Sequence, residues 1–252
     1  MKSKIRLGIL GGGGDSLIGI VHRIASSMHD KYSIIGGVFN PDYSENLKFA
    51  KEIGLDESRV YEDYDKMIQE ELKLDKSQRM QVVSILTPNF LHYPMAKKLL
   101  ENNFNVICEK PMTTTYEEAL DLERIYKSKE LTFAVTYTYT GYPMIRQMKE
   151  MIKNGIIGDI QRVDLQYYQG WINPIIHDTV KRSETWRLQP DKSGISCCIG
   201  DIGTHAFDML EYVTGMEVQE LLSDLNYVYD DNTMDVDGTI LIRFSDKIKG
   251  VI

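Results

Sequence analysis

Short apolar stretches with strand character alternate with helical stretches through the first half of this sequence. The apolar stretches lie at 4–10, 33–39, 82–86, 106–108 and 132–135, with a shorter one at 60–61. Between them, apolar residues recur at helical spacing, as at Leu47, Ala50 and Ile53. Strands that alternate with helices in this way predict an α/β fold with a doubly wound parallel sheet. Right-handed crossovers then leave few possible topologies.

The pattern changes near Thr136. Apolar and polar residues then alternate, with apolar positions at 163, 165 and 167 and again at 240, 242 and 244. A period of two is typical of an antiparallel sheet with one wet face. We therefore predict one domain over residues 1–139 and an α+β domain with a mostly antiparallel sheet over 140–252. Because the sequence ends within an expected strand at residues 250–252, we expect this second domain to be incomplete.

Charge and cysteine content exclude several classes of protein. The net charge of -8 argues against binding to nucleic acid, which requires a basic face. No apolar run approaches the roughly 18 residues of a membrane helix, and the N-terminus runs directly into a strand, so we expect neither a membrane segment nor a signal peptide. The cysteines are Cys108, Cys197 and Cys198, and this spacing suits neither a disulfide framework nor a metal site. We expect free thiols, no bound metal and a cytoplasmic location.

A glycine-rich loop follows the first apolar stretch. It runs Gly11, Gly12, Gly13, Gly14, Asp15, Ser16, and a helix is expected to follow from Leu17 and Ile18. Glycines let a backbone turn sharply and approach a pyrophosphate, and the helix start presents N–H groups to phosphates. The G-x-G-x-x-G fingerprint is met only in part, because Ser16 and then Gly19 follow Gly13. We predict a dinucleotide-binding loop with Gly19 serving close packing, and the alternative is a flexible surface turn.

The end of the second apolar stretch bears on the choice of cofactor. An acidic residue there would bind the 2′-hydroxyl of an adenosine ribose. Here Asn40 occupies that place and Asp42 lies two residues later. Asparagine can bind a hydroxyl but would not repel a phosphate, and no arginine follows directly. The sequence therefore leaves NAD and NADP open, with a lean toward NAD.

Opposite charges follow the buried stretch 106–108. Glu109, Lys110 and Pro111 stand where a parallel strand would end, and this edge of an open α/β sheet is where ligands bind. A lysine held there by a glutamate could touch a reacting oxygen. The alternative is a surface ion pair at a strand end, worth roughly 0–1 kcal/mol.

Asp201 and His205 form a second candidate catalytic group. A spacing of four on a helix places both side chains on one face, where a carboxylate can orient an imidazole for acid–base chemistry. Alternatively, Asp201 caps a helix and His205 is a packed surface residue. We interpret His22, His29 and His177 as mainly structural or solvated, although His177 could line a substrate cleft. Trp186 and Arg187 either line a substrate pocket or serve packing.

Together these motifs resemble the glucose–fructose oxidoreductase, inositol dehydrogenase and MocA family (Gfo/Idh/MocA). The resemblance rests on the glycine loop, on Thr87-Pro88-Asn89 with His92, on Glu109-Lys110-Pro111, on the segment 193–205, and on Ile18-Gly19-Ile20-Val21-His22-Arg23. It implies a Rossmann domain and an NAD(P)-dependent dehydrogenase that acts on a secondary alcohol of a sugar, cyclitol or related polyol. It also implies a homo-oligomer formed through the C-terminal sheet.

The resemblance implies a role for each motif. Lys110 would contact both cofactor and substrate, His205 would be the general base or acid, and Asp201 would act at the same centre. Thr87, Pro88, Asn89 and His92 would line the cofactor, and Glu109 would help at the ribose. Pro111 is often cis in such enzymes.

The sequence also departs from the family. Ile195, Ser196, Cys197 and Cys198 stand where small glycines usually precede the Asp–His helix, and family members are commonly longer. Two alternatives to an active enzyme therefore stay open. One is a dinucleotide-binding sensor or regulator without catalysis, and the other is an inactive fragment of a longer dehydrogenase.

Overall fold

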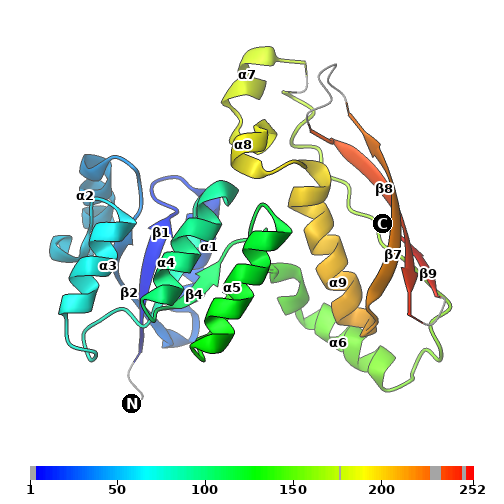
Figure 1. The fold of residues 1–252 in the computed structure, drawn as a ribbon, viewed down its shortest axis with the longest axis horizontal. Helices are drawn as coiled ribbons and strands as arrows, with labels where there is room; N and C mark the ends of the chain where they lie inside the picture. Colours follow the sequence, from blue (N-terminus) through cyan, green and yellow to red (C-terminus); the bar gives the residue numbers. More distant parts are fainter. Residues whose placement is uncertain (1–3, 176, 228–233, 246–247) are drawn as a thin grey trace. The chain divides into compact units, whose positions relative to one another are not determined.

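The computed structural model describes residues 4–175, 177–227, 234–245 and 248–252 (Figure 1). The chain forms two compact units, one ending at Thr136 and the other beginning at Tyr137. This division falls within a few residues of the boundary predicted after residue 139. Each unit has its own sheet and its own apolar core.

Within the described residues of the first unit, five parallel strands form a sheet in the order β2-β1-β3-β4-β5. They are β1 (Ile5–Gly11), β2 (Tyr32–Val38), β3 (Val82–Leu86), β4 (Asn105–Cys108) and β5 (Phe133–Val135). This confirms the predicted parallel sheet. The short strand predicted at 60–61 is wrong: Val60 forms only an isolated bridge to Gly37. The chain turns into the next helix at Tyr64, which leaves no length for further pairing.

Helices cover both faces of this sheet. They are α1 (Leu17–Ser27), α2 (Tyr43–Glu52), α3 (Tyr64–Lys73), α4 (His92–Glu101) and α5 (Tyr116–Ser128). Neighbouring residues of β1 point to opposite faces, so Ile9 packs in one cluster with Phe49 of α2, whereas Leu10 packs in another with Leu99 of α4 and Leu122 of α5. The sheet is therefore doubly wound, as the alternation of strands and helices predicts.

The strand order places a ligand-binding crevice beside β1. From β1 the chain passes to β2 on one side, and it later returns to β3 on the other side. Gly11 at the end of β1 lies beside Leu86 at the end of β3. Ligands of open α/β sheets bind outside the carboxyl ends of the strands where the strand order reverses. The glycine loop and the loop that begins at Thr87 therefore emerge together at this position.

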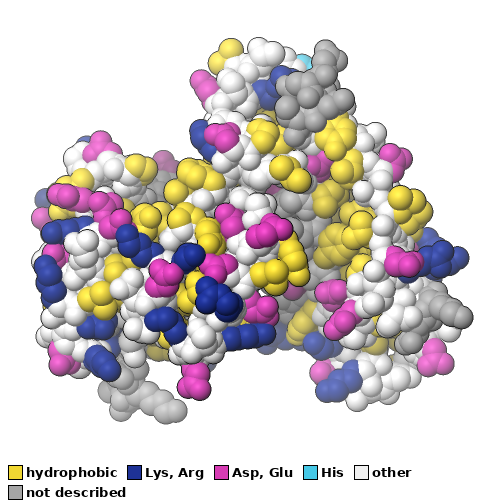
Figure 2. Space-filling view, in the orientation of Figure 1, with side chains coloured by type: hydrophobic (Ala, Val, Ile, Leu, Met, Phe, Trp, Pro, Cys, Tyr) yellow, Lys and Arg dark blue, Asp and Glu magenta, His cyan; other side chains and the backbone are white. Residues whose placement is uncertain are grey.

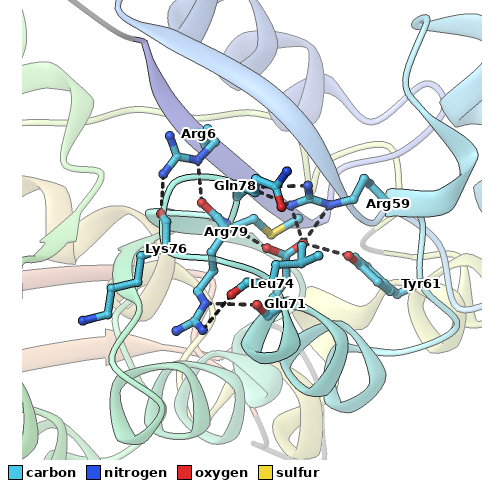
Figure 3. A network of polar contacts seen from close by, with 9 residues as sticks. Arg6, Arg59, Tyr61, Glu71, Leu74, Lys76, Gln78 and Arg79 are labelled. Atoms are coloured by element: carbon cyan, nitrogen blue, oxygen red, sulfur yellow. Dashed lines mark hydrogen bonds and ion pairs between the residues drawn. The ribbon is translucent and has the colours of Figure 1, made fainter.

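A buried carboxylate near the C-terminal end of α3 organises a network of polar contacts (Figure 3). Glu71 is fully buried and accepts hydrogen bonds from Arg59, from the Tyr61 hydroxyl (2.7 Å) and from the Met80 backbone N–H (2.8 Å). Burial, and then the hydrogen bond to Glu71, raise the pKa of Tyr61. Arg79 donates to the carbonyls of Glu71 and Leu74. The network ties the end of α3 to the loop that leads into β3.

In the described part of the second unit, four strands form a sheet in the order β6-β9-β8-β7. They are β6 (Arg162–Asp164), β7 (Val218–Asn226), β8 (Asp237–Phe244) and β9 (Lys249–Val251). β8 pairs antiparallel with both neighbours, whereas β6 pairs parallel with β9. The strand predicted to reach position 167 is shorter than expected. After Leu165, whose N–H donates to the Val251 carbonyl, the pairing ends, and Tyr167 instead contacts another tyrosine.

The helices of the second unit are α6 (Pro143–Lys153), α7 (Thr179–Glu184), α8 (Pro190–Ser193) and α9 (Thr204–Thr214). Leu210 and Phe207 of α9 pack on Ile240 and Ile242 of β8. The alternation at 240, 242 and 244 is confirmed, since all these side chains are buried. The sheet therefore turns its apolar face toward α9.

Charged side chains are interspersed over the first unit on the face drawn in Figure 2, where lysines and arginines lie among aspartates and glutamates. Across the part of the chain that the structure describes, no helix has the length and apolar character needed to span a membrane.

Candidate active site

The glycine loop bends away from β1 in a conformation that side chains rarely adopt. Gly12 and Gly14 have φ of +69° and +53°. A Cβ on Gly13 would lie 2.7 Å from the Phe39 carbonyl oxygen, whereas one on Gly14 would meet no described atom within 4 Å. The loop is therefore closely packed at Gly13 and has open space beside Gly14. This shape suits the close approach of a phosphate to backbone N–H groups.

Helix α1 is held close to this loop. A Cβ on Gly19 would lie 1.9 Å from the Gly12 carbonyl oxygen, which agrees with the predicted packing role of Gly19. Ser16 caps the helix by accepting a hydrogen bond from the Gly19 N–H. Arg23 Nη1 donates to the Gly12 carbonyl at 2.7 Å. Asp15 belongs to the turn before the helix, and Leu17 and Ile18 form its first turn.

A cavity of about 300 Å³ joins the glycine loop to two other predicted segments. Gly11, Asn40 and Thr87 all contribute to its lining. The other residues that line it are mostly apolar and include two acidic ones: Leu10, Val38, Phe39, Pro41, Glu62, Asp63, Tyr64, Leu91 and Met95. A largely apolar pocket with a few polar groups is what a nucleotide base and its ribose require.

The loop after β2 is fixed by Asn46, which the sequence interpretation missed. Asn46 is fully buried, and its Oδ1 accepts from the backbone N–H groups of Phe39 (2.5 Å) and Asn40 (2.8 Å). Its amide donates to the carbonyls of Asn40 and Tyr61. The backbone of Asn40 is therefore rigid. Asn46 and Tyr61 lie apart in the sequence and meet only in the folded chain, so no local sequence pattern predicts this role.

Glu109 stands directly after β4 and is largely buried. Its Oε1 lies 2.9 Å from His22 Nε2 and accepts a hydrogen bond from Thr136 Oγ1 at 2.5 Å. Burial acts to raise the pKa of Glu109, but the hydrogen bonds from His22 and Thr136 outweigh it, so the pKa lies below the usual value. Glu109 is therefore ionised at neutral pH. The Lys110–Pro111 peptide bond that follows is cis.

His92 lies beneath this segment rather than at its surface. Its imidazole is fully buried, with Nδ1 2.7 Å from the Pro111 carbonyl and Nε2 2.9 Å from the Thr87 carbonyl. Burial lowers the pKa of His92. A neutral imidazole has one N–H, so it donates to one of these carbonyls and only contacts the other. This geometry favours a role in holding two loops together, and direct contact with a cofactor stays a prediction.

Thr87, Pro88 and Asn89 follow β3 without a break. Thr87 lies beside the end of β1 in the cavity described above, and Asn89 opens a short 3₁₀ turn that leads into α4. Asn89 is buried. The first unit therefore gathers Gly11, Asn40 and Thr87 around one cavity, while His92 links Thr87 to the segment that carries Lys110.

In the second unit, Asp201 and His205 lie on consecutive turns of different type. Asp201 is in a π-helical turn (Ile199–Gly203), and His205 is in the first turn of α9. The expected regular α-helical spacing between them is therefore wrong, because the wider turn intervenes. π-turns occur often at functional sites, and no four-residue spacing in a sequence reveals one.

Tyrosine rings surround His205, which is buried. The centroid of the Tyr139 ring lies 4.5 Å from that of His205, and the Tyr137 ring lies edge-on at 5.8 Å. The hydroxyl groups of Tyr139 and Tyr167 are 2.7 Å apart. This hydrogen bond, with burial, raises the pKa of Tyr139 to about 12. The sequence interpretation missed this cluster because its members lie far apart in the chain.

Asp235 fixes the start of the helix that carries Asp201. It is fully buried, and its two carboxylate oxygens accept from the N–H groups of Cys197 (3.0 Å) and Ile199 (2.8 Å). Its carbonyl accepts from the Cys198 N–H. A carboxylate at a helix N-terminus satisfies donors that would otherwise lack partners. Asp235 thereby anchors the segment where the sequence has Cys197 and Cys198 in place of glycines.

A cavity of about 110 Å³ borders Asp201 within the second unit. Its lining includes aromatic side chains and both neighbouring cysteines: Tyr167, Tyr168, Trp171, Cys197 and Cys198.

The other residues considered for a substrate pocket lie as follows. Arg187 is stacked on Trp186, with Cζ 4.5 Å from the centroid of the indole ring, and His177 is exposed. Within the described residues, no group of three or more His, Cys, Asp and Glu side chains is arranged to hold a metal ion.

Comparison with known proteins gives matches along almost the whole chain. Residues 5–137 match the oxidoreductase family with an NAD-binding Rossmann fold, and residues 145–252 match the GFO/IDH/MocA C-terminal domain. An uncharacterized oxidoreductase of Bacillus subtilis, YfiI, is 35% identical over 89% of this chain and 57% of its own length.

Solved structures agree with this result. An inositol dehydrogenase homolog of Azotobacter vinelandii in complex with NAD+ superposes with a TM-score of 0.92 at 28% identity. The same homolog with NADH and myo-inositol gives a TM-score of 0.89. Both matches cover 100% of this chain and 64% of the other. The chain therefore spans about three fifths of the length of these relatives.

Proposed function

Because this chain belongs to the GFO/IDH/MocA family of oxidoreductases, we propose that it transfers a hydride between a nicotinamide dinucleotide and a secondary alcohol of a sugar, cyclitol or related polyol. One observation carries the proposal. Gly11, at the start of the glycine loop, lines one cavity with Asn40 and Thr87 at the reversal of the strand order, where α/β sheets bind nucleotides. The open space above Gly14 and the close packing below Gly13 fit a pyrophosphate.

The residues of the chain divide the chemistry between them. When bound, the nicotinamide accepts or returns the hydride. Lys110 supplies a cation for the negative charge that develops on the substrate oxygen, and His205 takes or returns the hydroxyl proton. Asp201 orients the substrate or the imidazole. Thr87, Pro88, Asn89 and Glu109 place the cofactor beside Lys110.

NAD fits the adenosine side of the cavity better than NADP. Glu62 and Asp63 are among the residues that line it, and among the described residues that line it none is a lysine or arginine. Asn40 Oδ1 accepts a hydrogen bond from the Asp42 N–H, which restrains its side chain. A 2′-phosphate would meet negative charge and find no cation there. We therefore expect NADH to bind more tightly than NADPH.

Cofactor binding tests the proposal through Gly13. Replacing Gly13 by alanine places a Cβ 2.7 Å from the Phe39 carbonyl, so the loop must shift. We expect NADH to bind at least about tenfold more weakly, a loss of about 1.4 kcal/mol, as measured by quenching of protein fluorescence. Gly141→Ala is the matched control, because a Cβ there meets no described atom within 4 Å. Unchanged affinity in Gly13→Ala would remove the loop from the cofactor site, and a parent chain that binds neither NADH nor NADPH would end the proposal.

The outer face of the second sheet supports a homo-oligomer. Leu222 on β7 lies opposite Leu241 on β8, and these side chains are 69% and 52% exposed. They border a groove of about 340 Å³ that also includes Arg162, Arg243 and Lys249. Exposed apolar pairs framed by charge are typical of interfaces. We expect sedimentation equilibrium to give a mass of more than one chain, and a single-chain mass at every concentration would contradict this.

A further inference from the structure

We propose that His22 is a positioning residue for Lys110 and acts on it through the carboxylate of Glu109. The inference rests on the proposed function, in which Lys110 touches the reacting oxygen. Nothing in the motifs marks His22 for this role, because it lies on α1 and is separated from Glu109 by most of the first unit's sequence. The sequence alone favours a structural or solvated histidine.

The imidazole of His22 bridges three elements. Nε2 lies 2.9 Å from Glu109 Oε1 after β4, and Nδ1 lies 3.2 Å from Ser84 Oγ on β3. The side chains of His22 and Glu109 are only 14% and 12% exposed. A buried carboxylate only accepts hydrogen bonds, so Nε2 carries the proton that it donates, and Nδ1 can accept from the Ser84 hydroxyl. The ring therefore has a partner at each nitrogen and a single orientation.

Glu109 transmits this orientation to Lys110. Its other oxygen, Oε2, accepts from the Lys110 backbone N–H at 3.3 Å, and Thr136 donates to Oε1. His92 Nδ1 lies 2.7 Å from the carbonyl oxygen of the next residue, Pro111. Lys110 thus stands between Glu109, which His22 contacts, and Pro111, which His92 contacts. Loss of the His22 contact would leave a buried carboxylate partly unsatisfied, and the carboxylate would then move or recruit water.

The neighbour of His22 connects the same helix to the glycine loop. Arg23 Nη1 donates to the Gly12 carbonyl at 2.7 Å. Consecutive residues of α1 therefore hold the loop of the proposed cofactor site and the segment that carries Lys110. A rigid link of this kind keeps a cation at a fixed place relative to a bound pyrophosphate. Misplacement by about 1 Å can cost a reaction about 100-fold.

Two substitutions at position 22 separate the contacts. His22→Gln keeps an amide N–H that reaches Glu109, whereas His22→Asn reaches only toward Ser84. His29→Asn is the matched control, since His29 is exposed and its φ of +60° is one that asparagine tolerates. The first readout needs no activity: the rate at which acetic anhydride acylates Lys110, measured by mass spectrometry of the peptide. The second is turnover with NAD and a polyol or sugar that the parent oxidises.

We expect His22→Asn to change the acylation rate of Lys110 and to lower kcat about 10- to 100-fold, while His22→Gln restores both toward parent values. In a Glu109→Gln background, His22→Asn should cost little more, because the path through Glu109 is already broken. Parent-like acylation and turnover in His22→Asn, or a His22→Gln variant no better than His22→Asn, would overturn the inference. If the parent turns over no substrate, the proposed function fails, and Lys110 acylation alone decides the role of His22.

Discussion

Replacing Lys110 by alanine is expected to lower kcat by about 10²- to 10⁴-fold while the chain keeps its fold. The ammonium group is the one cation that the proposal places at the substrate oxygen, so its loss removes stabilisation of charge that develops only in the transition state. The backbone of this segment is held by contacts from Glu109 and His92 that do not involve the lysine side chain. Steady-state kinetics with NAD and circular dichroism measure the two parts of the prediction.

Controls separate catalysis from binding. Lys127→Ala, on the exposed face of α5, removes a lysine that forms an ion pair with Glu123 and should leave kcat unchanged. NADH should still bind to Lys110→Ala, since the glycine loop and the cavity near Asn40 are untouched. If Lys110 and His205 serve the same chemical step, their double alanine variant should lose less than the product of the single losses. Near-normal rates in both single variants would refute the assigned roles.

The first unit could be predicted closely because its signals are local. The run Val82–Leu86 is apolar apart from Ser84, and a short, mainly apolar run of this kind is typical of a buried parallel strand. Thr115 and Glu118 form a complete capping box that sets the start of α5. The strand predicted at 60–61 is wrong because pairing there depends on where α3 begins. Two adjacent apolar residues do not indicate that position.

Buried polar side chains make most of the contacts that could not be predicted from the sequence. His22, Asn46 and Asp235 each bind groups that are distant in the chain, such as Glu109 and the N–H of Cys197. A histidine in a helix or an aspartate before a strand looks the same in a sequence whether it is solvated or buried. Only the fold decides which polar groups meet, so the motifs paired Glu109 with Lys110 but did not place His22 beside Glu109.

The second unit shows the same limit in its backbone. The alternation through positions 163–167 resembles a strand, yet β6 ends at Asp164. Tyr167 lies outside the strand pairing, and its hydroxyl forms a hydrogen bond with that of Tyr139, which belongs to an earlier segment of the chain. A contact between such segments can outweigh the strand propensity of an aromatic residue. The candidate residue His205 was found by its motif, but the tyrosine rings around it were not.

A second large effect is expected at Glu71, far from the proposed chemistry. We expect Glu71→Ala to lower the free energy of unfolding by about 3–5 kcal/mol, because it leaves a largely buried guanidinium and two buried donors without this acceptor. Those donors are Arg59, the Tyr61 hydroxyl and the Met80 N–H (Figure 3). The loss of stability arises from the uncompensated charge rather than from the volume of the deleted side chain, because the substitution removes only a short hydrocarbon stem along with the carboxylate.

The neighbouring residue provides a matched control. Glu70 carries the same side chain and pairs with Lys66 and Lys73, but on the surface of α3. Surface ion pairs contribute little, so Glu70→Ala should leave the denaturation midpoint unchanged. Tyr61→Phe removes one donor and leaves the ion pair intact, and it should cost about 1–2 kcal/mol. A graded series of this kind distinguishes a network from a single bond.

Urea denaturation can report on the two units separately. Both tryptophans, Trp171 and Trp186, lie in the second unit, so tryptophan fluorescence follows that unit, whereas far-ultraviolet circular dichroism also follows the first. Glu71→Ala should move the circular dichroism midpoint to lower urea, in proportion to the loss divided by the m-value. A curve for Glu71→Ala that superimposes on the curve for Glu70→Ala would show that the buried carboxylate is dispensable. In that case the packing of Met67, Ile68 and Met80 alone holds α3 to the sheet.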